Sequence, residues 1–96
     1  MRLRERRRCD HADRPPCLRT ALRQLRMRVL EARGPVGISA FIERANGVAL
    51  LANLSKQSQS AHILAALTSM LARGSAADMR ETIYAGLDRA TGALRN

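Results

Sequence analysis

Four stretches of this 96-residue chain repeat apolar residues at the spacing of an α-helix. In the first stretch these residues are Leu18, Leu22, Leu25 and Val29, separated by four, three and four positions. Such spacing places them on one face of a helix. We expect this helix to span residues 17–33 and to end at Gly34-Pro35, because glycine favours a helix stop and proline cannot continue a helix.

The second stretch, residues 38–57, has a less regular pattern. Its apolar positions on one helical face are Phe41, Ile42, Ala45, Val48, Ala49, Leu51 and Ala52, and Ser39 is a candidate N-cap. Asn46-Gly47 is also typical of a tight turn, so the alternative is a hairpin that pairs residues 38–44 with 48–54. We favour a helix because residues 48–52 do not alternate with period two and are mainly alanine and leucine. Gly47 is a candidate break that would divide it into two shorter helices.

The polar run 55–60 predicts a loop whose last residue, Ser60, caps the next helix. That helix carries apolar positions Ile63, Leu64, Leu67, Met70 and Leu71 and is expected to end at Gly74. Residues 75–78 form a capping-box-like start for a last helix that continues to Asn96. Its apolar positions are Met79, Ile83, Leu87, Ala90 and Leu94. Because only Gly74-Ser75 separates the two helices, we expect an antiparallel pair or a sharp corner.

Together these patterns predict an all-α fold: a small bundle of three to four short helices with a C-terminal helical hairpin. Residues 1–16 are rich in arginine, nearly lack apolar residues and end in Pro15-Pro16, so we expect a disordered basic arm. Residues 17–96 are then a single small helical domain. Phe41 and Tyr84 are the only aromatic residues, which leaves an aliphatic core and predicts marginal stability for an isolated monomer.

Charge is concentrated near the N-terminus. Residues 1–34 hold eleven arginines against four acidic residues, residues 35–96 hold six basic residues against four acidic ones, and the net charge is +9. Arg19, Arg23, Arg26 and Arg33 form a second stripe on the first predicted helix. Arginine forms bidentate contacts with phosphates, so the candidate polyanion contacts are Arg2, Arg4, Arg6, Arg7, Arg8, Arg14, Arg19, Arg23, Arg26 and Arg33. Base-stacking aromatic residues are missing among them, which favours non-specific binding.

The chain has no apolar run long enough to span a membrane and no apolar segment typical of a secretion signal. We therefore expect a cytoplasmic protein. The high arginine and alanine content, with Lys56 as the single lysine, suits a bacterium with a GC-rich genome. Two alternatives remain open: translation from Met27, which would remove residues 1–26 and with them the whole basic arm, and a chain that is a fragment of a larger protein.

Candidate chemistry is sparse. Cys9, His11 and Cys17 supply three soft ligands without a fourth nearby, so no metal site is predicted, and His62 is expected to be an ordinary helix residue. No nucleophile with a base and an orienting group, and no glycine-rich phosphate loop, can be identified. We predict a non-enzymatic protein without catalytic residues or cofactors.

Residues 75–96 loosely resemble the helix-turn-helix pattern of bacterial repressors, with residues 86–91 where the turn would enter the recognition helix. That pattern requires apolar residues where this chain has Glu81, Gly92 and Arg95, so a continuous helix explains the segment better.

Two hypotheses follow from the sequence. The first is a helical module that binds a protein partner or a second copy. Its candidate interface residues are Ile63, Leu64, Leu67, Met70, Leu71, Met79, Ile83, Leu87 and Leu94. The second is non-specific binding of nucleic acid or another polyanion through the arginines.

Overall fold

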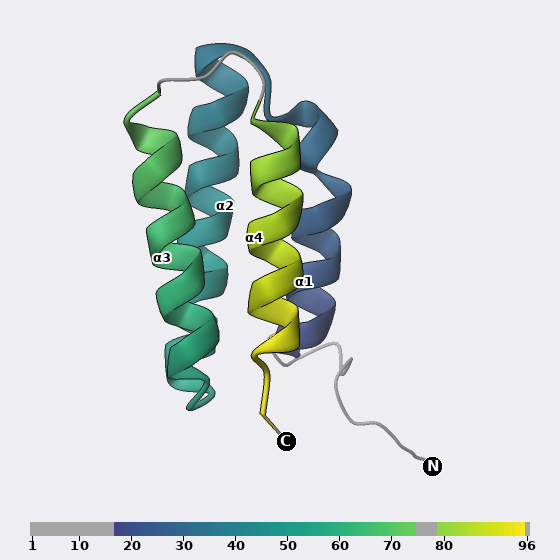
Figure 1. Cartoon of the computed structure of the whole chain (residues 1–96), viewed down its shortest axis with the longest axis vertical. Coiled ribbons are helices and arrows are strands. Elements are labelled where there is room, and N and C mark those ends of the chain that lie inside the picture. The colour runs from purple at the N-terminus through teal and green to yellow at the C-terminus, as the bar shows by residue number, and fades with distance from the viewer. Residues whose placement is uncertain (1–16, 75–78, 96) are drawn as a thin grey trace.

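The computed structural model describes residues 17–74 and 79–95, and this part of the chain is all-α (Figure 1). The helices are α1 (Leu18–Met27), α2 (Gly34–Leu54), α3 (Ser58–Ala72) and α4 (Arg80–Gly92), with a 3-10 turn, η1 (Val29–Glu31), between α1 and α2. No strand occurs within these residues, which confirms the predicted fold class and excludes the hairpin alternative for the second stretch. None of the described helices combines the length and the apolar character needed to cross a bilayer. The predicted disordered arm, 1–16, lies outside the described residues.

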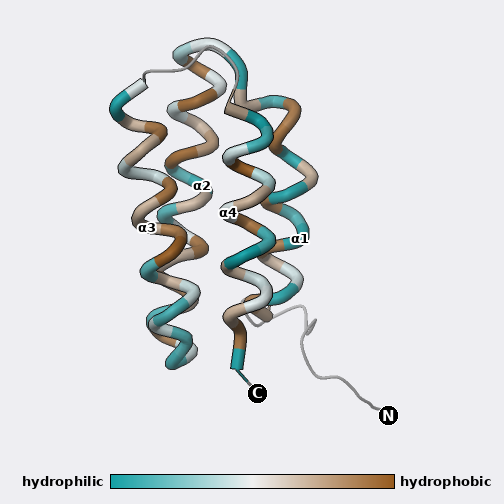
Figure 2. Tube along the Cα trace, in the orientation of Figure 1, coloured by the Kyte–Doolittle hydropathy of each residue, from teal (hydrophilic) through white to brown (hydrophobic). Residues whose placement is uncertain are grey.

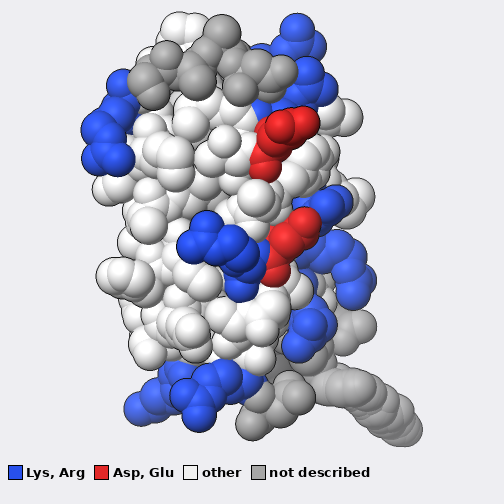
Figure 3. Space-filling view, in the orientation of Figure 1, with Lys and Arg blue, Asp and Glu red and all other residues white. Residues whose placement is uncertain are grey.

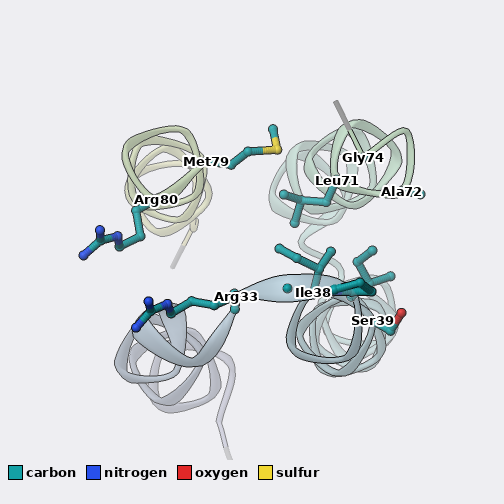
Figure 4. Close-up of a pocket in the computed structure, with 12 residues that line it drawn as sticks. Arg33, Ile38, Ser39, Leu71, Ala72, Gly74, Met79 and Arg80 are labelled. Carbon is teal, nitrogen blue, oxygen red and sulfur yellow. The ribbon is translucent and has the colours of Figure 1, made fainter. Parts of the chain in front are cut away.

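The four helices run alternately up and down, so that each packs antiparallel to its neighbour in the chain (Figure 1). Seen along the bundle, they occupy the corners of a square in which α1 lies beside α2 and α4, and α3 beside α2 and α4 (Figure 4). Diagonally opposed helices stay apart. The seam between α2 and α3 is the most extensive, whereas both seams made by the short α1 are small.

The core lies between the four helices and is built from the predicted stripes. Its buried side chains include Leu18, Leu22, Leu25 and Val29 from the first stretch, Leu64, Leu67 and Leu71 from α3, and Ile83, Leu87 and Ala90 from α4. Helical spacing therefore identified the inward face of these three segments. Figure 2 shows hydrophobic positions recurring along every helix, while much of α1 is hydrophilic.

The predicted first helix is too long. It ends at Met27 rather than at residue 33, and the chain continues as η1, in which the Glu31 and Ala32 amides donate to carbonyls three residues earlier, each at 3.0 Å. This tighter winding keeps Val29 fully buried while the chain turns toward α2. Gly34-Pro35 then begins α2 instead of ending the first helix, since a proline in the first turn loses no in-helix hydrogen bond.

Helix α2 is continuous, so the candidate break at Gly47 does not occur. A glycine in a helix interior costs only about 0.5–1 kcal/mol, and the buried face around Phe41, Ala45 and Ala52 holds the helix together across it. Ser39 is not an N-cap, because α2 begins five residues earlier and Ser39 lies within the helix.

Helix α2 ends at Leu54 in a Schellman motif. The amide of Gln57 donates to the carbonyl of Ala52 at 2.8 Å, and that of Lys56 donates to Asn53 at 3.1 Å. Lys56 takes the left-handed conformation, with φ of 64°, that glycine usually supplies at this position. The loop is therefore shorter than the polar run predicted.

Helix α3 begins at Ser58, so Ser60 is inside its first turn and does not cap it. Ser60 is instead fully buried, and its hydroxyl donates to the carbonyl of Ala90 on α4 at 2.6 Å. Carbonyls in the last turn of a helix have no donor within the helix, so Ser60 supplies one from the neighbouring helix. At its other end α3 stops as predicted, with Gly74 at φ of 62°.

Helices α3 and α4 form an antiparallel pair, which was one of the two expected arrangements. The capping box predicted for residues 75–78 lies outside the described residues. Helix α4 begins at Arg80 and ends at Gly92, so the prediction of a helix continuing to Asn96 is wrong. The side chain of Gln57 holds the chain just after α4. Its Oε1 accepts a hydrogen bond from the backbone amide of Arg95 at 2.8 Å, and its Nε2 donates to the Arg95 carbonyl. These bonds tie the end of α4 to the start of α3. No turn interrupts α4 at Gly86, in keeping with a continuous helix.

Candidate functional site

The predicted polyanion contacts are only partly described by the structure. Arg2, Arg4, Arg6, Arg7, Arg8 and Arg14 all precede residue 17 and lie outside the described residues. Arg19, Arg23 and Arg26 are exposed on α1 and face away from the core. Arg33 is exposed in the connection to α2 and does not extend the α1 stripe, because α1 ends at Met27. The structure thus brings together three of the four arginines of the predicted stripe.

Within this group Arg26 is engaged by α4. Its Nε donates to Asp88 Oδ1 at 3.0 Å, and its guanidinium lies 4.6 Å from the centre of the Tyr84 ring. The hydrogen bond to Asp88, followed by the charge of that carboxylate, raises the pKa of Arg26. Both side chains are about half exposed, at 50% and 59%, so the pair is a surface salt bridge that fixes the α1–α4 contact weakly.

Arg19 and Arg23 form no ion pair with another residue that the structure describes. Helix α1 itself contains no acidic residue. In the view of Figure 3, basic side chains gather along the α1 side of the molecule, with the acidic side chains on the adjoining face. This arginine ridge, defined as Arg19, Arg23 and Arg26, is a positive but partly neutralised surface.

The predicted helix-interface residues serve the core of this chain. Leu64, Leu67, Leu71, Ile83 and Leu87 are at most 3% exposed, and Ile63, Met70, Met79 and Leu94 are partly buried against the same core. The structure therefore brings all nine together between α3, α4 and their neighbours. In this folded state the five buried side chains present no surface to another molecule.

Apolar surface remains elsewhere, at residues that the sequence reasoning did not select. The large exposed apolar side chains are Met27 (73%), Leu30 (58%), Val36 (84%), Leu50 (61%) and Leu54 (72%). Three of them belong to α2, whose apolar residues surround the helix instead of forming one stripe. A helix that is apolar on all sides is normally enclosed on all sides, whereas α2 is covered only by α1, η1 and α3. The spread of apolar residues around α2 was therefore the feature of the sequence that could have indicated an uncovered apolar surface.

Beside this surface a groove of about 670 Å³ runs between α1 and α2. Residues that line it are Ala21, Gln24, Leu25, Met27 and Arg28 from the α1 side, and Arg44, Gly47, Val48 and Leu51 from α2. Leu50 and Leu54 each lie three positions beyond a lining residue, Gly47 and Leu51, and so are its immediate neighbours on the α2 surface. We call the groove together with Leu50 and Leu54 the α1–α2 face.

A second hollow, of about 890 Å³, opens at the end of the bundle where η1 leads into α2. In Figure 4 Ile38 and Leu71 point into it from α2 and α3, while the guanidinium groups of Arg33 and Arg80 extend to the side. Gly74 and Met79 both line this hollow, and the residues that join them lie outside the described part of the chain. We therefore assign no ligand to it.

Metal and catalytic chemistry gain no support from the described residues. Of the three candidate ligands, Cys9 and His11 precede the described chain, and the Cys17 sulfur lies 3.2 Å from the Thr20 hydroxyl. His62 is exposed on α3, as expected of an ordinary helix residue. Within residues 17–74 and 79–95, no three His, Cys, Asp or Glu side chains gather at a distance suited to a metal ion.

Comparison with known proteins gives no relative from which a function can be transferred. No family model, no curated protein and no solved structure matches this chain. The surfaces of the folded chain are therefore the available indication of its function.

Proposed function

We propose that this chain is a helical protein-interaction module that binds another protein through the α1–α2 face. The observation that carries the proposal is the exposure of Leu50 and Leu54, at 61% and 72%, next to an apolar groove. Each large aliphatic side chain removed from water contributes about 1.5–3 kcal/mol. A partner that covers both leucines and fills the groove would gain that free energy. Such an apolar surface is typical of interaction sites.

The test is to immobilise the full-length protein and a double variant, Leu50→Gln with Leu54→Gln, and to measure how much partner protein each one captures. Val36→Gln is the matched control, since Val36 is the most exposed of these apolar residues and lies at the opposite end of α2. We expect the wild type and the control to retain protein partners even after nuclease treatment. The double variant should lose these partners. Equal capture by all three proteins would contradict the proposal. Circular dichroism should show that every variant keeps its helices.

A second candidate function, non-specific polyanion binding, is favoured by the arginine ridge and by the lack of acidic residues on α1. Its test is a salt titration of DNA binding. Each phosphate contact contributes a slope of about −0.9 to the logarithm of the binding constant against the logarithm of salt concentration. Replacing Arg19, Arg23 and Arg26 with glutamine should flatten that slope if the ridge contacts phosphates. Unchanged binding would remove the ridge from consideration and would leave the first proposal intact.

A further inference from the structure

We infer that the α1–α2 groove receives an amphipathic helix of a partner protein, with acidic residues flanking its apolar stripe. The inference rests on the proposed function and specifies the chemistry of the partner. Three independent features support it: the shape of the groove, the position of Gly47, and the charges at its rim.

The shape of the groove suits a helix. It lies between two antiparallel helices, and its apolar floor includes Leu25, Val48 and Leu51. Along α1 it extends from Ala21 to Arg28, which is about 10 Å or two helical turns. A partner helix placed in this direction inserts apolar residues spaced three and four apart, as in other helix-in-groove complexes. Leu50 and Leu54 extend the apolar contact beyond the groove itself.

Gly47 gives a more specific indication. Glycine weakens a helix interior, and the other glycines placed against packed elements are needed by the chain itself. A Cβ on Gly37 would overlap the backbone oxygen of Glu31, and a Cβ on Gly86 would lie 3.1 Å from Leu67. A Cβ on Gly47 would meet nothing within 4 Å, as is also true at Gly34 and Gly92, but of these three glycines only Gly47 lines the groove. The small residue therefore allows a backbone from outside the chain to approach α2 closely.

The charge at the rim selects an acidic partner. Arg28 and Arg44 flank the groove from its two sides. Arg44 forms no ion pair with a described residue, and the 3.2 Å pair between Arg28 and Glu31 is exposed and readily exchanged. Carboxylates on a bound helix would pair with both arginines. A second copy of this chain would instead bring two further arginines and a net charge of +9 to the same place.

The experiment uses a displayed library of 14-residue helices selected against the full-length protein. Apolar residues are fixed at positions i, i+3, i+4 and i+7, and the flanking positions vary among Asp, Glu, Lys, Arg and Ala. We expect the selected helices to be enriched in Asp and Glu. Their synthetic peptides should bind about tenfold more weakly to Gly47→Leu, whose side chain occupies the groove. Binding should also weaken severalfold for Arg28→Gln with Arg44→Gln, and this difference should shrink in high salt.

Two variants serve as controls. Gly92→Leu introduces the same side chain at another helical position where a Cβ meets nothing within 4 Å. Arg73→Gln with Arg89→Gln removes two exposed charges outside the groove. Both should bind the selected peptides as the wild type does.

The inference is overturned if no helix is selected, if selected helices carry no excess of acidic residues, or if Gly47→Leu binds as well as wild type. It is also overturned if sedimentation shows that the protein dimerises and that Gly47→Leu abolishes the dimer, because the occupant is then a second copy. These results are distinct from failure of the proposed function. If capture still depends on Leu50 and Leu54 but no acidic helix binds, the interaction module stands and only its assigned partner is wrong.

Discussion

The seam between α3 and α4 and the seam between α1 and α2 both join antiparallel neighbours, but only the first is closed along its middle, although its end at Leu71 and Met79 borders the second hollow. In the α3–α4 seam, Leu67 fills the space beside Gly86 and the Ser60 hydroxyl satisfies a carbonyl of the opposite helix. In the α1–α2 seam, the small residues Ala21 and Gly47 line the groove and leave it open. The difference shows that small residues close a seam only where a large side chain of the partner helix fills the space they provide.

The largest expected effect is a difference in stability between two leucine-to-alanine variants, one in the core of the closed seam and one on the surface beside the open seam. Leu87→Ala should destabilise the protein by about 2–5 kcal/mol, because Leu87 is 1% exposed and its loss leaves a cavity. Leu54→Ala, at a side chain 72% exposed, should change stability by less than about 0.5 kcal/mol. Urea denaturation of both variants measures the difference. Similar losses for the two variants would show that the α1–α2 face is already covered in solution.

A matched pair of glycine substitutions compares the seams directly. Gly86→Leu should cost about 1–3 kcal/mol, since the new side chain must displace Leu67 from a position where even a Cβ lies 3.1 Å away. Gly47→Leu has open space and should not lower the melting temperature. The comparison fails if both variants lose the same stability in thermal melts.

Ser60→Ala tests the hydrogen bond that joins α3 to α4 across the closed seam. The substitution leaves the buried carbonyl of Ala90 without the hydroxyl donor that now lies 2.6 Å away. We expect a loss of about 1–3 kcal/mol in the free energy of unfolding, the cost of an unsatisfied buried polar group. Hydrogen exchange of the last turn of α4 provides a second measurement and should accelerate. An unchanged exchange rate there would argue against this role for Ser60.

Gly47→Ala should have a smaller effect of opposite sign. Alanine restores helix propensity without a steric conflict, so the variant should gain about 0.5–1 kcal/mol. Chemical denaturation measures the gain. A loss of stability would mean that α2 requires a glycine at this position for its own packing.

The smallest effect is expected at Arg26. Its pair with Asp88 is exposed, so Arg26→Gln should weaken the docking of α1 slightly in low salt and not at all near 1 M salt, where such charges are screened. The pKa of Arg26 is raised, so Arg26 keeps its charge throughout the neutral range and loses it only in strong alkali. Melting temperatures of variant and wild type at two salt concentrations test this. A gap that persists in high salt would instead indicate a packing role over Tyr84.

The sequence was sufficient for the fold class and for the inward faces of α1, α3 and α4, because those faces repeat at helical spacing. It was insufficient for helix boundaries. Ser60 has the chemistry of a cap, yet its hydroxyl bonds to a helix that is thirty residues away in the chain. Such tertiary partners leave no local signal. Gly34-Pro35 is equally ambiguous, since glycine and proline occur both after helices and at their starts.

The groove was missed for a related reason. Apolar residues are spread around the whole circumference of helix α2, so periodicity does not indicate which of them face outward. The exposure of Leu50 and Leu54 depends on where α1 and α3 lie, which only the assembled bundle reveals. Of the nine predicted interface residues, five are buried in the core of this chain and four pack against that core partly buried.

Tyr84 is the only tyrosine of a chain without tryptophan, and it lies at the contact between α1 and α4. Ultraviolet emission from the native protein therefore originates almost entirely from one ring beneath the Arg26 guanidinium. If heating releases the ten-residue α1 before the other helices melt, that emission changes at a lower temperature than the far-ultraviolet ellipticity does. Tyr84 fluorescence thus reports on the α1–α4 contact, the least extensive contact between α-helices, without an attached label.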